Sequence, residues 1–222
     1  MIKYAIFDLD GTLLSTLESI RYHLNRTLVS NGLSEVTLSQ CGEFIGNGAR
    51  KLVTRAVNAG GVSDEALIDK ALAEYNEAYN SDPLPHTYPY PGIAELVDAL
   101  YERGIALGVV TNKPEPTAIQ LIEHFFGGKF RFVRGGRAGA ILKPDPTDSL
   151  AALSEIGGTP EECIFVGDTY VDILTGKNMG AALSVGVLWG FRTYEELDEA
   201  GADIIVKDAG EILLAIEKYE KN

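Results

Sequence analysis

The chain has 222 residues, 45% of them hydrophobic, and can therefore bury a full core in one large domain or in one domain with an insertion. Its 32 acidic residues outnumber 19 basic ones and give a net charge of −13, which argues against nucleic acid and anionic membranes as partners. No segment reaches the roughly 18 apolar residues of a membrane helix, and the N-terminus lacks a signal-peptide pattern. Cys41 and Cys163 lie far apart, which favours a reducing, cytoplasmic location.

The first strand is predicted at Ile2 to Phe7, a largely apolar run that ends in Asp8, Asp10 and Gly11. In an open α/β sheet, ligands bind beyond the carboxyl ends of the strands, so both acids are expected in that crevice. Two carboxylates this close repel each other unless one is protonated or a cation lies between them. The sequence therefore suggests a divalent cation at this strand end, and oxygen ligands suit Mg²⁺.

A helical insertion is expected directly after this strand. A capping box at Ser15 to Glu18 opens the first helix, and a second box, Thr37 to Gln40, opens a short one. Further helices are predicted from Ala49 to Ala59 and from Ser63 to about Asn80. Residues 81–92 are rich in proline, cannot form a helix interior, and are interpreted as the return linker. The predicted division is a core of residues 1–14 and 88–222 and an insertion of residues 15–87.

From Gly92 onward, short apolar strands alternate with helices, a pattern typical of a parallel sheet with helices on both faces. The expected strands are Ile105 to Val110, Arg131 to Val133, Cys163 to Val166, Ala182 to Leu188 and Asp203 to Val206. The expected helices are Ile93 to Glu102, Thr117 to Phe126, Thr147 to Ile156, Asp172 to Met179 and a terminal one. The predicted fold is α/β: a Rossmann-like, doubly wound parallel sheet with a small helical unit inserted after the first strand.

Polar residues follow several of these strands. They are Asp8 with Asp10, Thr111 with Asn112, Lys143 on a loop, and Asp168 with Asp172. Because the carboxyl ends of parallel strands lie along one edge, all of them can face one crevice. The set combines acids for a metal with a lysine, a hydroxyl and backbone amides for an anion.

These motifs, in this order, resemble those of the haloacid dehalogenase superfamily. The matching segments are Asp8 to Thr12, Thr111-Asn112, Lys143-Pro144 and Gly167 to Asp172, and the resemblance runs from about residue 2 to about residue 206. It implies a phosphohydrolase in which Asp8 attacks phosphorus to give an aspartyl phosphate and Asp10 acts as acid and base.

The resemblance also implies the remaining roles in the site. Mg²⁺ would be held by the Asp8 carboxylate, the backbone carbonyl of Asp10 and Asp168, with Asp172 as ligand or close neighbour. Lys143, the Thr111 hydroxyl and the Asn112 amide would bind the phosphoryl oxygens. The helical insertion corresponds to the small cap of that family. At Ser15, and near Gly135 to Arg137, the family commonly has an Asp that this chain lacks.

Specificity is expected to lie in the cap, chiefly in residues 46–56. Gly46, Asn47 and Gly48 lead into a helix that carries Arg50 and Arg55. The segment is similar to that of the phosphoglycolate phosphatase subgroup, which implies a small phosphorylated metabolite with a second anionic group, most simply 2-phosphoglycolate. The alternative is that Arg50 and Lys51 are solvated and that Arg55 pairs with an acid of the insertion.

Other functions are compatible with the same motifs. A sugar phosphomutase or a pyrophosphatase would use the same fold, whereas dehalogenation is disfavoured because a halide leaving group needs no proton from Asp10. A phospho-acceptor regulatory module also combines an Asp, an acidic metal site, a Thr and a Lys. The sequence leaves open whether the protein is a monomer or a homodimer.

Overall fold

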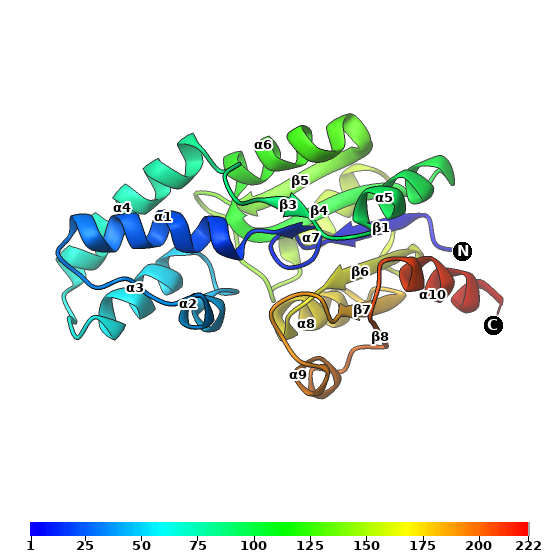
Figure 1. The fold of residues 1–222 in the computed structure, drawn as a ribbon. Coiled ribbons are helices and arrows are strands. Elements are labelled where there is room, and N and C mark those ends of the chain that lie inside the picture. Colours follow the sequence, from blue (N-terminus) through cyan, green and yellow to red (C-terminus); the bar gives the residue numbers. More distant parts are fainter. Residues whose placement is uncertain (222) are drawn as a thin grey trace.

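The computed structural model, which describes residues 1–221, contains a six-stranded parallel sheet in the order β5-β4-β1-β6-β7-β8 (Figure 1). The strands are β1 (Tyr4–Phe7), β4 (Ala106–Pro114), β5 (Phe130–Gly136), β6 (Cys163–Gly167), β7 (Leu183–Val187) and β8 (Ile204–Val206). Strand β1 lies inside the sheet and pairs with β4 on one side and β6 on the other. The carboxyl ends of these three strands therefore meet at one place, and the predicted fold class is confirmed.

Helices cover both faces of the sheet, and each face has its own apolar cluster. One face carries α5 (Ile93–Glu102), α6 (Glu115–Phe126) and α10 (Gly210–Lys221), whose side chains pack in a large cluster with those of β1, β4 and β7. The opposite face carries α7 (Thr147–Glu155) and α8 (Tyr170–Met179) around a smaller cluster. All residues of β6 and β7 are buried, as expected for strands covered on both sides.

Two strands and one helix differ from the prediction. Strand β5 was expected over Arg131 to Val133 but runs to Gly136. Strand β4 was expected to end at Val110 but continues to Pro114, because its pairing with β5 resumes at Pro114 and Gly136 after an irregularity. Thr111, Asn112 and Lys113 therefore belong to a strand. The helix α9 (Tyr194–Glu199) was not predicted; it begins with a capping box between Thr193 and Glu196.

Four helices form a separate layer beside the sheet, called here the helical region (Figure 1). They are α1 (Leu17–Ser30), α2 (Leu38–Phe44), α3 (Ala49–Ala59) and α4 (Glu65–Ser81). Buried apolar side chains from all four pack together in one cluster. The predicted capping box of α2 is confirmed, since Thr37 and Gln40 exchange side-chain and backbone hydrogen bonds.

The capping box predicted for α1 is wrong. The residue before that helix is Thr16, and its side chain makes no capping hydrogen bond. The reason is that Ser15 belongs to a short strand, β2 (Leu14–Ser15), which pairs antiparallel with β3 (Tyr88–Pro89). The two passages between the sheet and the helical region thus lie side by side. The boundaries expected there, after residues 14 and 87, stay a prediction.

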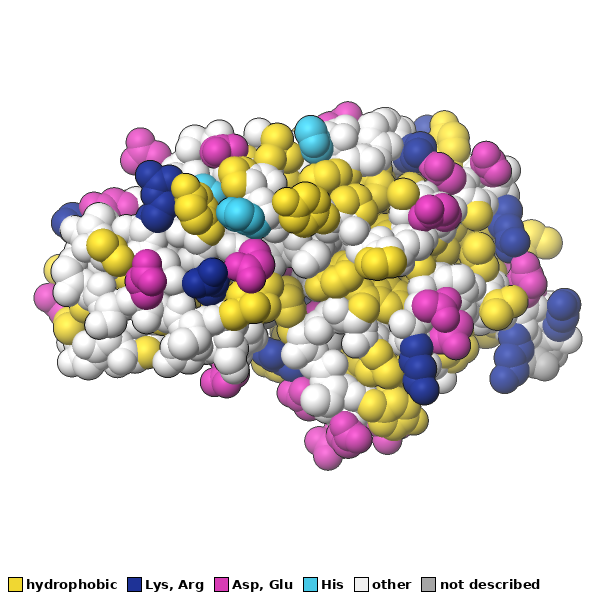
Figure 2. Space-filling view, viewed as in Figure 1, with side chains coloured by type: hydrophobic (Ala, Val, Ile, Leu, Met, Phe, Trp, Pro, Cys, Tyr) yellow, Lys and Arg dark blue, Asp and Glu magenta, His cyan; other side chains and the backbone are white. Residues whose placement is uncertain are grey.

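The charges on the surface are dispersed. Figure 2 shows that Lys and Arg side chains on the viewed face are scattered singly or in small numbers, separated by acidic, apolar and neutral ones. Among residues 1–221, no helix combines the length and apolar character needed to cross a bilayer.

Candidate active site

Three buried carboxylates converge at the carboxyl end of β1. Asp8 directly follows β1, Asp168 directly follows β6, and Asp172 lies in the first turn of α8. One oxygen from each lies within 4.8 Å of one from each of the others. Asp8, Asp168 and Asp172 thus form a compact acidic group, called here the acidic triad, at the point where the topology brings adjacent strand ends together.

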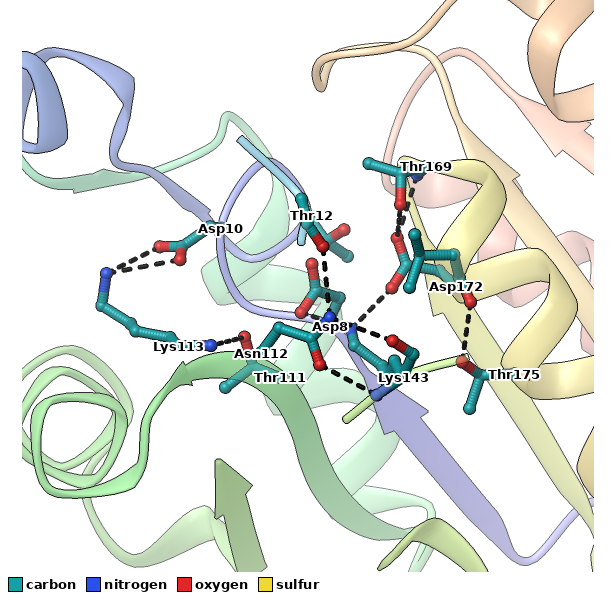
Figure 3. Close-up of polar contacts among 12 residues, drawn as sticks. Asp8, Asp10, Thr12, Thr111, Asn112, Lys113, Lys143, Thr169, Asp172 and Thr175 are labelled. Atoms are coloured by element: carbon teal, nitrogen blue, oxygen red, sulfur yellow. Dashed lines mark hydrogen bonds and ion pairs between the residues drawn. The ribbon is translucent and has the colours of Figure 1, made fainter. Parts of the chain in front are cut away.

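Lys143 joins two members of the acidic triad (Figure 3). Its Nζ lies 2.7 Å from Asp8 Oδ1 and 2.6 Å from Asp172 Oδ1, and its side chain is only 3% exposed. Burial alone would lower the pKa of Lys143, but the attraction of Asp172 and Asp8 outweighs it and raises the pKa above 10.5. The ammonium is therefore held charged next to Asp8.

Asp168 is fixed by donors on both oxygens. The Thr12 hydroxyl donates to Oδ1 at 2.9 Å, and the Phe191 N–H donates to Oδ2 at 2.8 Å. Two glycines make room for this side chain. A Cβ at Gly11, where φ is +90°, would lie 2.3 Å from Asp168 Oδ2, and one at Gly190 would lie 2.2 Å from its Cβ. Any larger residue at either position would displace Asp168.

Asp172 has a double role in the local structure. Its Oδ2 accepts hydrogen bonds from the Thr169 N–H at 2.9 Å and the Thr169 hydroxyl at 2.8 Å, which caps α8. Its Oδ1 contacts Lys143. The cap holds the carboxylate so that one oxygen faces the site.

The residues of the acidic triad fit a divalent cation. Three buried carboxylates face one ammonium, so the group carries excess negative charge. Burial raises the pKa of Asp8 from 3.8 to about 7 although Lys143 opposes the rise, and burial with the repulsion of Asp172 and Asp8 raises the pKa of Asp168 well above 3.8. A cation with oxygen ligands such as Mg²⁺ would relieve this repulsion.

Asp10, the fourth acid of the predicted set, is not a member of the acidic triad. Its carboxylate turns toward Lys113, whose Nζ lies 3.0 Å from Oδ1 and 3.3 Å from Oδ2. Only the backbone carbonyl of Asp10 was expected to reach the metal. The side chain is 15% exposed and borders the cavity beside Asp8.

Thr111 and Asn112 lie at the end of β4 and line the same cavity. The Asn112 side chain joins three segments: Nδ2 donates to the Gly46 carbonyl at 3.1 Å and to the Lys143 carbonyl at 3.2 Å, while Oδ1 accepts from the Lys143 N–H at 2.9 Å. Asn112 thereby holds the loop that carries Lys143 against the helical region.

Lys113 was not predicted as a site residue. It is 5% exposed and contacts both Asp10 and the hydroxyl of Tyr79 in the helical region. The signal that could have found it is the alternation of a strand: Lys113 is two residues after Thr111 and so shares its face. That signal was hidden because the strand was expected to end at Val110.

The cavity between the sheet edge and the helical region has a volume of about 60 Å³. From the helical region its lining includes Ile20, Leu52 and Tyr75, together with Gly46 and Gly48. The predicted substrate residues Asn47, Arg50 and Arg55 are not among the lining residues. The helical region therefore presents aliphatic side chains, two tyrosines (Tyr75 and Tyr79) and two glycines to the cavity.

The two arginines of α3 have partners elsewhere. Arg50 is exposed and pairs with Glu65 at 2.9 Å and Asp69 at 2.6 Å. Arg55 donates to the Phe44 carbonyl at 2.7 Å and to Asn47 Oδ1 at 2.9 Å.

Asn47 links this segment to the sheet region. Its Nδ2 donates to the Tyr170 hydroxyl at 3.2 Å. Through Asn47, Arg55 supports the turn at residues 46–48, whereas Arg50 pairs with two exposed acids of α4.

Comparison with known proteins agrees with this arrangement. Residues 5–185 match the family described as haloacid dehalogenase-like hydrolase. The chain is 35% identical over 219 residues to the phosphoglycolate phosphatase of Agrobacterium fabrum, covering 98% of this chain and 92% of that protein. It is 34% identical to the phosphoglycolate phosphatase of Aquifex aeolicus, covering 86% of each.

Solved structures show the same architecture. The crystal structure of a predicted phosphoglycolate phosphatase from Haemophilus somnus superposes with a TM-score of 0.90 at 27% identity, covering 97% of this chain and 98% of that one. The chain belongs to the haloacid dehalogenase-like hydrolase family.

Proposed function

We propose that the protein is a Mg²⁺-dependent phosphatase that cleaves a small phosphomonoester, most simply 2-phosphoglycolate, through an aspartyl phosphate on Asp8. The observation that carries this proposal is the position of Asp8, a buried carboxylate at the end of β1 whose Oδ1 lies 2.7 Å from the Lys143 ammonium. A carboxylate in that place can attack phosphorus while the adjacent positive charge compensates the anionic phosphate.

In the first step, an oxygen of Asp8 forms a bond to phosphorus and the bond from phosphorus to the ester oxygen breaks. Asp10 gives a proton to the departing alkoxide, which leaves as an alcohol. Lys143 supports the phosphoryl oxygens with its charge, and the Thr111 hydroxyl and the Asn112 N–H donate hydrogen bonds to them. Such fixed donors supply most of the catalysis in phosphoryl transfer.

In the second step, water attacks the phosphorus of the aspartyl phosphate and Asp10 takes its proton. The bond between phosphorus and Asp8 breaks, which restores the Asp8 carboxylate and releases inorganic phosphate. A positioned acid and base of this kind contributes about 10²–10⁴-fold in rate. Asp10 thus returns to its starting state at the end of each cycle.

Asp8, Asp168 and the backbone carbonyl of Asp10 would hold Mg²⁺, with Asp172 beside them. When bound, the ion supplies positive charge that offsets the negative charge of the phosphoryl group. Thr12 and the Phe191 N–H hold Asp168 in a fixed orientation, so that ligand needs no rearrangement when the site fills.

The substrate is proposed to be small because the cavity is small and the helical region forms its roof. Residues 15–87 are proposed to act as a cap, with the paired strands β2 and β3 as the connection to the core. Gly46 and Gly48 are proposed to bring backbone close to the second anionic group of the substrate, and Asn47 and Arg55 to support that turn. The proposal for the substrate draws further support from the names of the relatives.

Phosphate release from a panel of phosphomonoesters tests this function. We expect turnover that requires Mg²⁺, stops with a chelator, and is fastest on 2-phosphoglycolate. If Mg²⁺-dependent turnover is instead fastest on a nucleotide, a sugar phosphate or pyrophosphate, the proposed substrate is wrong and the proposed mechanism still stands. Conversion of one hexose phosphate into another would identify a mutase, and a stable phosphoprotein without turnover would identify a regulatory module.

A further inference from the structure

Lys113 lies where the sheet edge meets the helical region, and its contacts reach both. Its side chain is 2% exposed. One of its contacts is the Asp10 carboxylate, at 3.0 and 3.3 Å from the two oxygens. The other is Tyr79, whose hydroxyl lies 2.6 Å from Nζ and whose ring centroid lies 4.2 Å from it. An ammonium has three protons to donate, and these contacts use them on groups from two parts of the chain.

The orientation of Asp10 follows from this contact. In Figure 3 the Asp10 carboxylate turns toward Lys113 and away from Asp8, Lys143 and Asp172. Asp10 belongs to a tight loop in which the Gly11 N–H donates to the Leu14 carbonyl at 2.9 Å. The hydrogen bonds found for its carboxylate within residues 1–221 come from Lys113. Lys113 is therefore the group that determines where this carboxylate lies.

Tyr79 makes the orientation depend on the helical region. It is buried in the cluster of that region, stacks on Tyr75 with centroids 5.6 Å apart, and contacts His23 edge-on at 5.1 Å. The Tyr79 side chain therefore moves with the helical region, and its hydroxyl lies beside Lys113 only when α4 packs against the sheet edge. A displacement of α4 would remove one of the two partners of Lys113.

We propose that Lys113 is a positioning residue, which holds the Asp10 carboxylate in place for proton transfer and couples that placement to the helical region through Tyr79. This inference rests on the proposed function, in which Asp10 protonates the leaving oxygen. Lys113 acts through Asp10: it forms and breaks no bond in the proposed cycle and transfers no proton itself. Misplacement of a catalytic group by about 1 Å can cost about 10²-fold in rate, so a residue with this role has a large effect without taking part in the chemistry.

The test compares two leaving groups in one enzyme preparation. An alkyl ester such as 2-phosphoglycolate needs a proton on its departing oxygen, whereas p-nitrophenyl phosphate has a stable phenolate and needs little. The kcat/KM value reports the steps through the first cleavage. We expect Lys113→Met to lower kcat/KM for 2-phosphoglycolate by about 10²-fold and for p-nitrophenyl phosphate by only a few fold.

The ratio of the two values is the decisive quantity, because it does not depend on the fraction of folded enzyme. An equal loss of kcat/KM on both esters, or no loss, would overturn the inference.

Tyr79→Phe removes only the hydroxyl and is expected to shift the ratio in the same direction by a smaller factor. It also tests the inference if Lys113→Met does not fold. An unchanged ratio in Tyr79→Phe would overturn the coupling to the helical region. Lys129→Met, at an exposed pair with Asp98, is the control and should leave the ratio unchanged.

Asp10→Asn separates this inference from the proposed function. In that variant we again expect kcat/KM to fall more for 2-phosphoglycolate than for p-nitrophenyl phosphate. The change in the ratio should be at least as large as in Lys113→Met. If Asp10→Asn shows the split and Lys113→Met does not, only the role of Lys113 is wrong. If Asp10→Asn lowers kcat/KM equally for both esters, Asp10 does not act as the acid. The inference about Lys113 is then wrong as well.

Discussion

The sheet region and the helical region border the same cavity but contribute different side chains to it. The sheet edge contributes charged and polar groups: Asp8, Lys143 and Asp172 are in contact there, with Thr111 beside them. The helical region contributes the apolar side chains of Ile20 and Leu52. The groups that we propose to act on the phosphoryl group therefore come from the sheet region, and the helical region borders the space above them.

The difference has a physical cause in the two architectures. The carboxyl ends of adjacent parallel strands meet wherever such a sheet forms, so polar residues placed there converge. An arginine on a helix has no such constraint, and its partners are whichever acceptors lie beside it in the folded chain. Arg50 of α3 pairs with Glu65 and Asp69 of α4, because those acids face it across the outer surface.

The largest expected effect belongs to the sheet edge. Asp8→Asn removes the nucleophile and should lower kcat by about 10⁴-fold or more, as loss of a covalent nucleophile does in other enzymes. Phosphate release from 2-phosphoglycolate measures it. Asp98→Asn, at an exposed carboxylate, serves as the control. Residual turnover within about tenfold of the wild type would show that another group attacks phosphorus.

Binding of Mg²⁺ should stabilise the protein through the same edge. A ligand at 100 times its Kd stabilises the folded state by about 2.7 kcal/mol, so Mg²⁺ should raise the melting temperature of the wild type. Asp168→Asn should abolish that rise, because it removes one of the carboxylates proposed to hold the ion. Thermal melts with Mg²⁺ and with a chelator provide the measurement. If Mg²⁺ still raises the melting temperature of Asp168→Asn, the ion binds to residues other than Asp168.

The two arginines of α3 provide a matched pair within the helical region. Arg55→Ala removes charged hydrogen bonds to the turn at residues 46–48 and should raise KM for 2-phosphoglycolate about tenfold. Arg50→Ala breaks only exposed ion pairs and should change KM by less than about twofold. The reverse order would mean that Arg50 swings into the cavity and binds the substrate directly.

A smaller effect concerns stability and pH in the helical region. Burial lowers the pKa of His23 below 6.5, so the unfolded chain binds a proton more readily than the folded one. The neutral, buried His23 therefore adds its full contribution to the free energy of unfolding above pH 6.5. That contribution is lost as the pH falls through 6.5 toward the lower pKa of His23 in the folded state. Urea denaturation from pH 8 to pH 5 should show a steeper loss in the wild type than in His23→Phe. Parallel curves would refute the shift.

Several features could be predicted from the sequence because they depend on local pattern. The order of strands and helices follows from apolar periodicity, and the meeting of Asp8 with Asp168 follows from the topology of a parallel sheet. The capping box at Thr37 was found for the same reason, since a few adjacent residues determine it. The family followed from four motifs in a fixed order.

Other features depend on contacts between distant segments. The extension of β4 beyond Val110 depends on pairing with β5, so Lys113 lies outside the strand that the sequence predicts. Ser15 forms a strand instead of a cap because it pairs with Tyr88, which lies 73 positions further along the chain. The partners of Arg50 belong to another helix. In each case the deciding partner is remote in the chain, and no local pattern reports it.

The attack by Asp8 can be tested without relying on steady-state rates. In Asp10→Asn, an aryl phosphate should still phosphorylate the enzyme, because its leaving group needs no proton, while hydrolysis lacks its base. Acid quenching followed by mass spectrometry of the peptides should therefore find close to one phosphoryl group per enzyme, on the peptide that contains Asp8. Turnover of the aryl phosphate without any phosphorylated peptide, or with the phosphoryl group on a different residue, would contradict the mechanism.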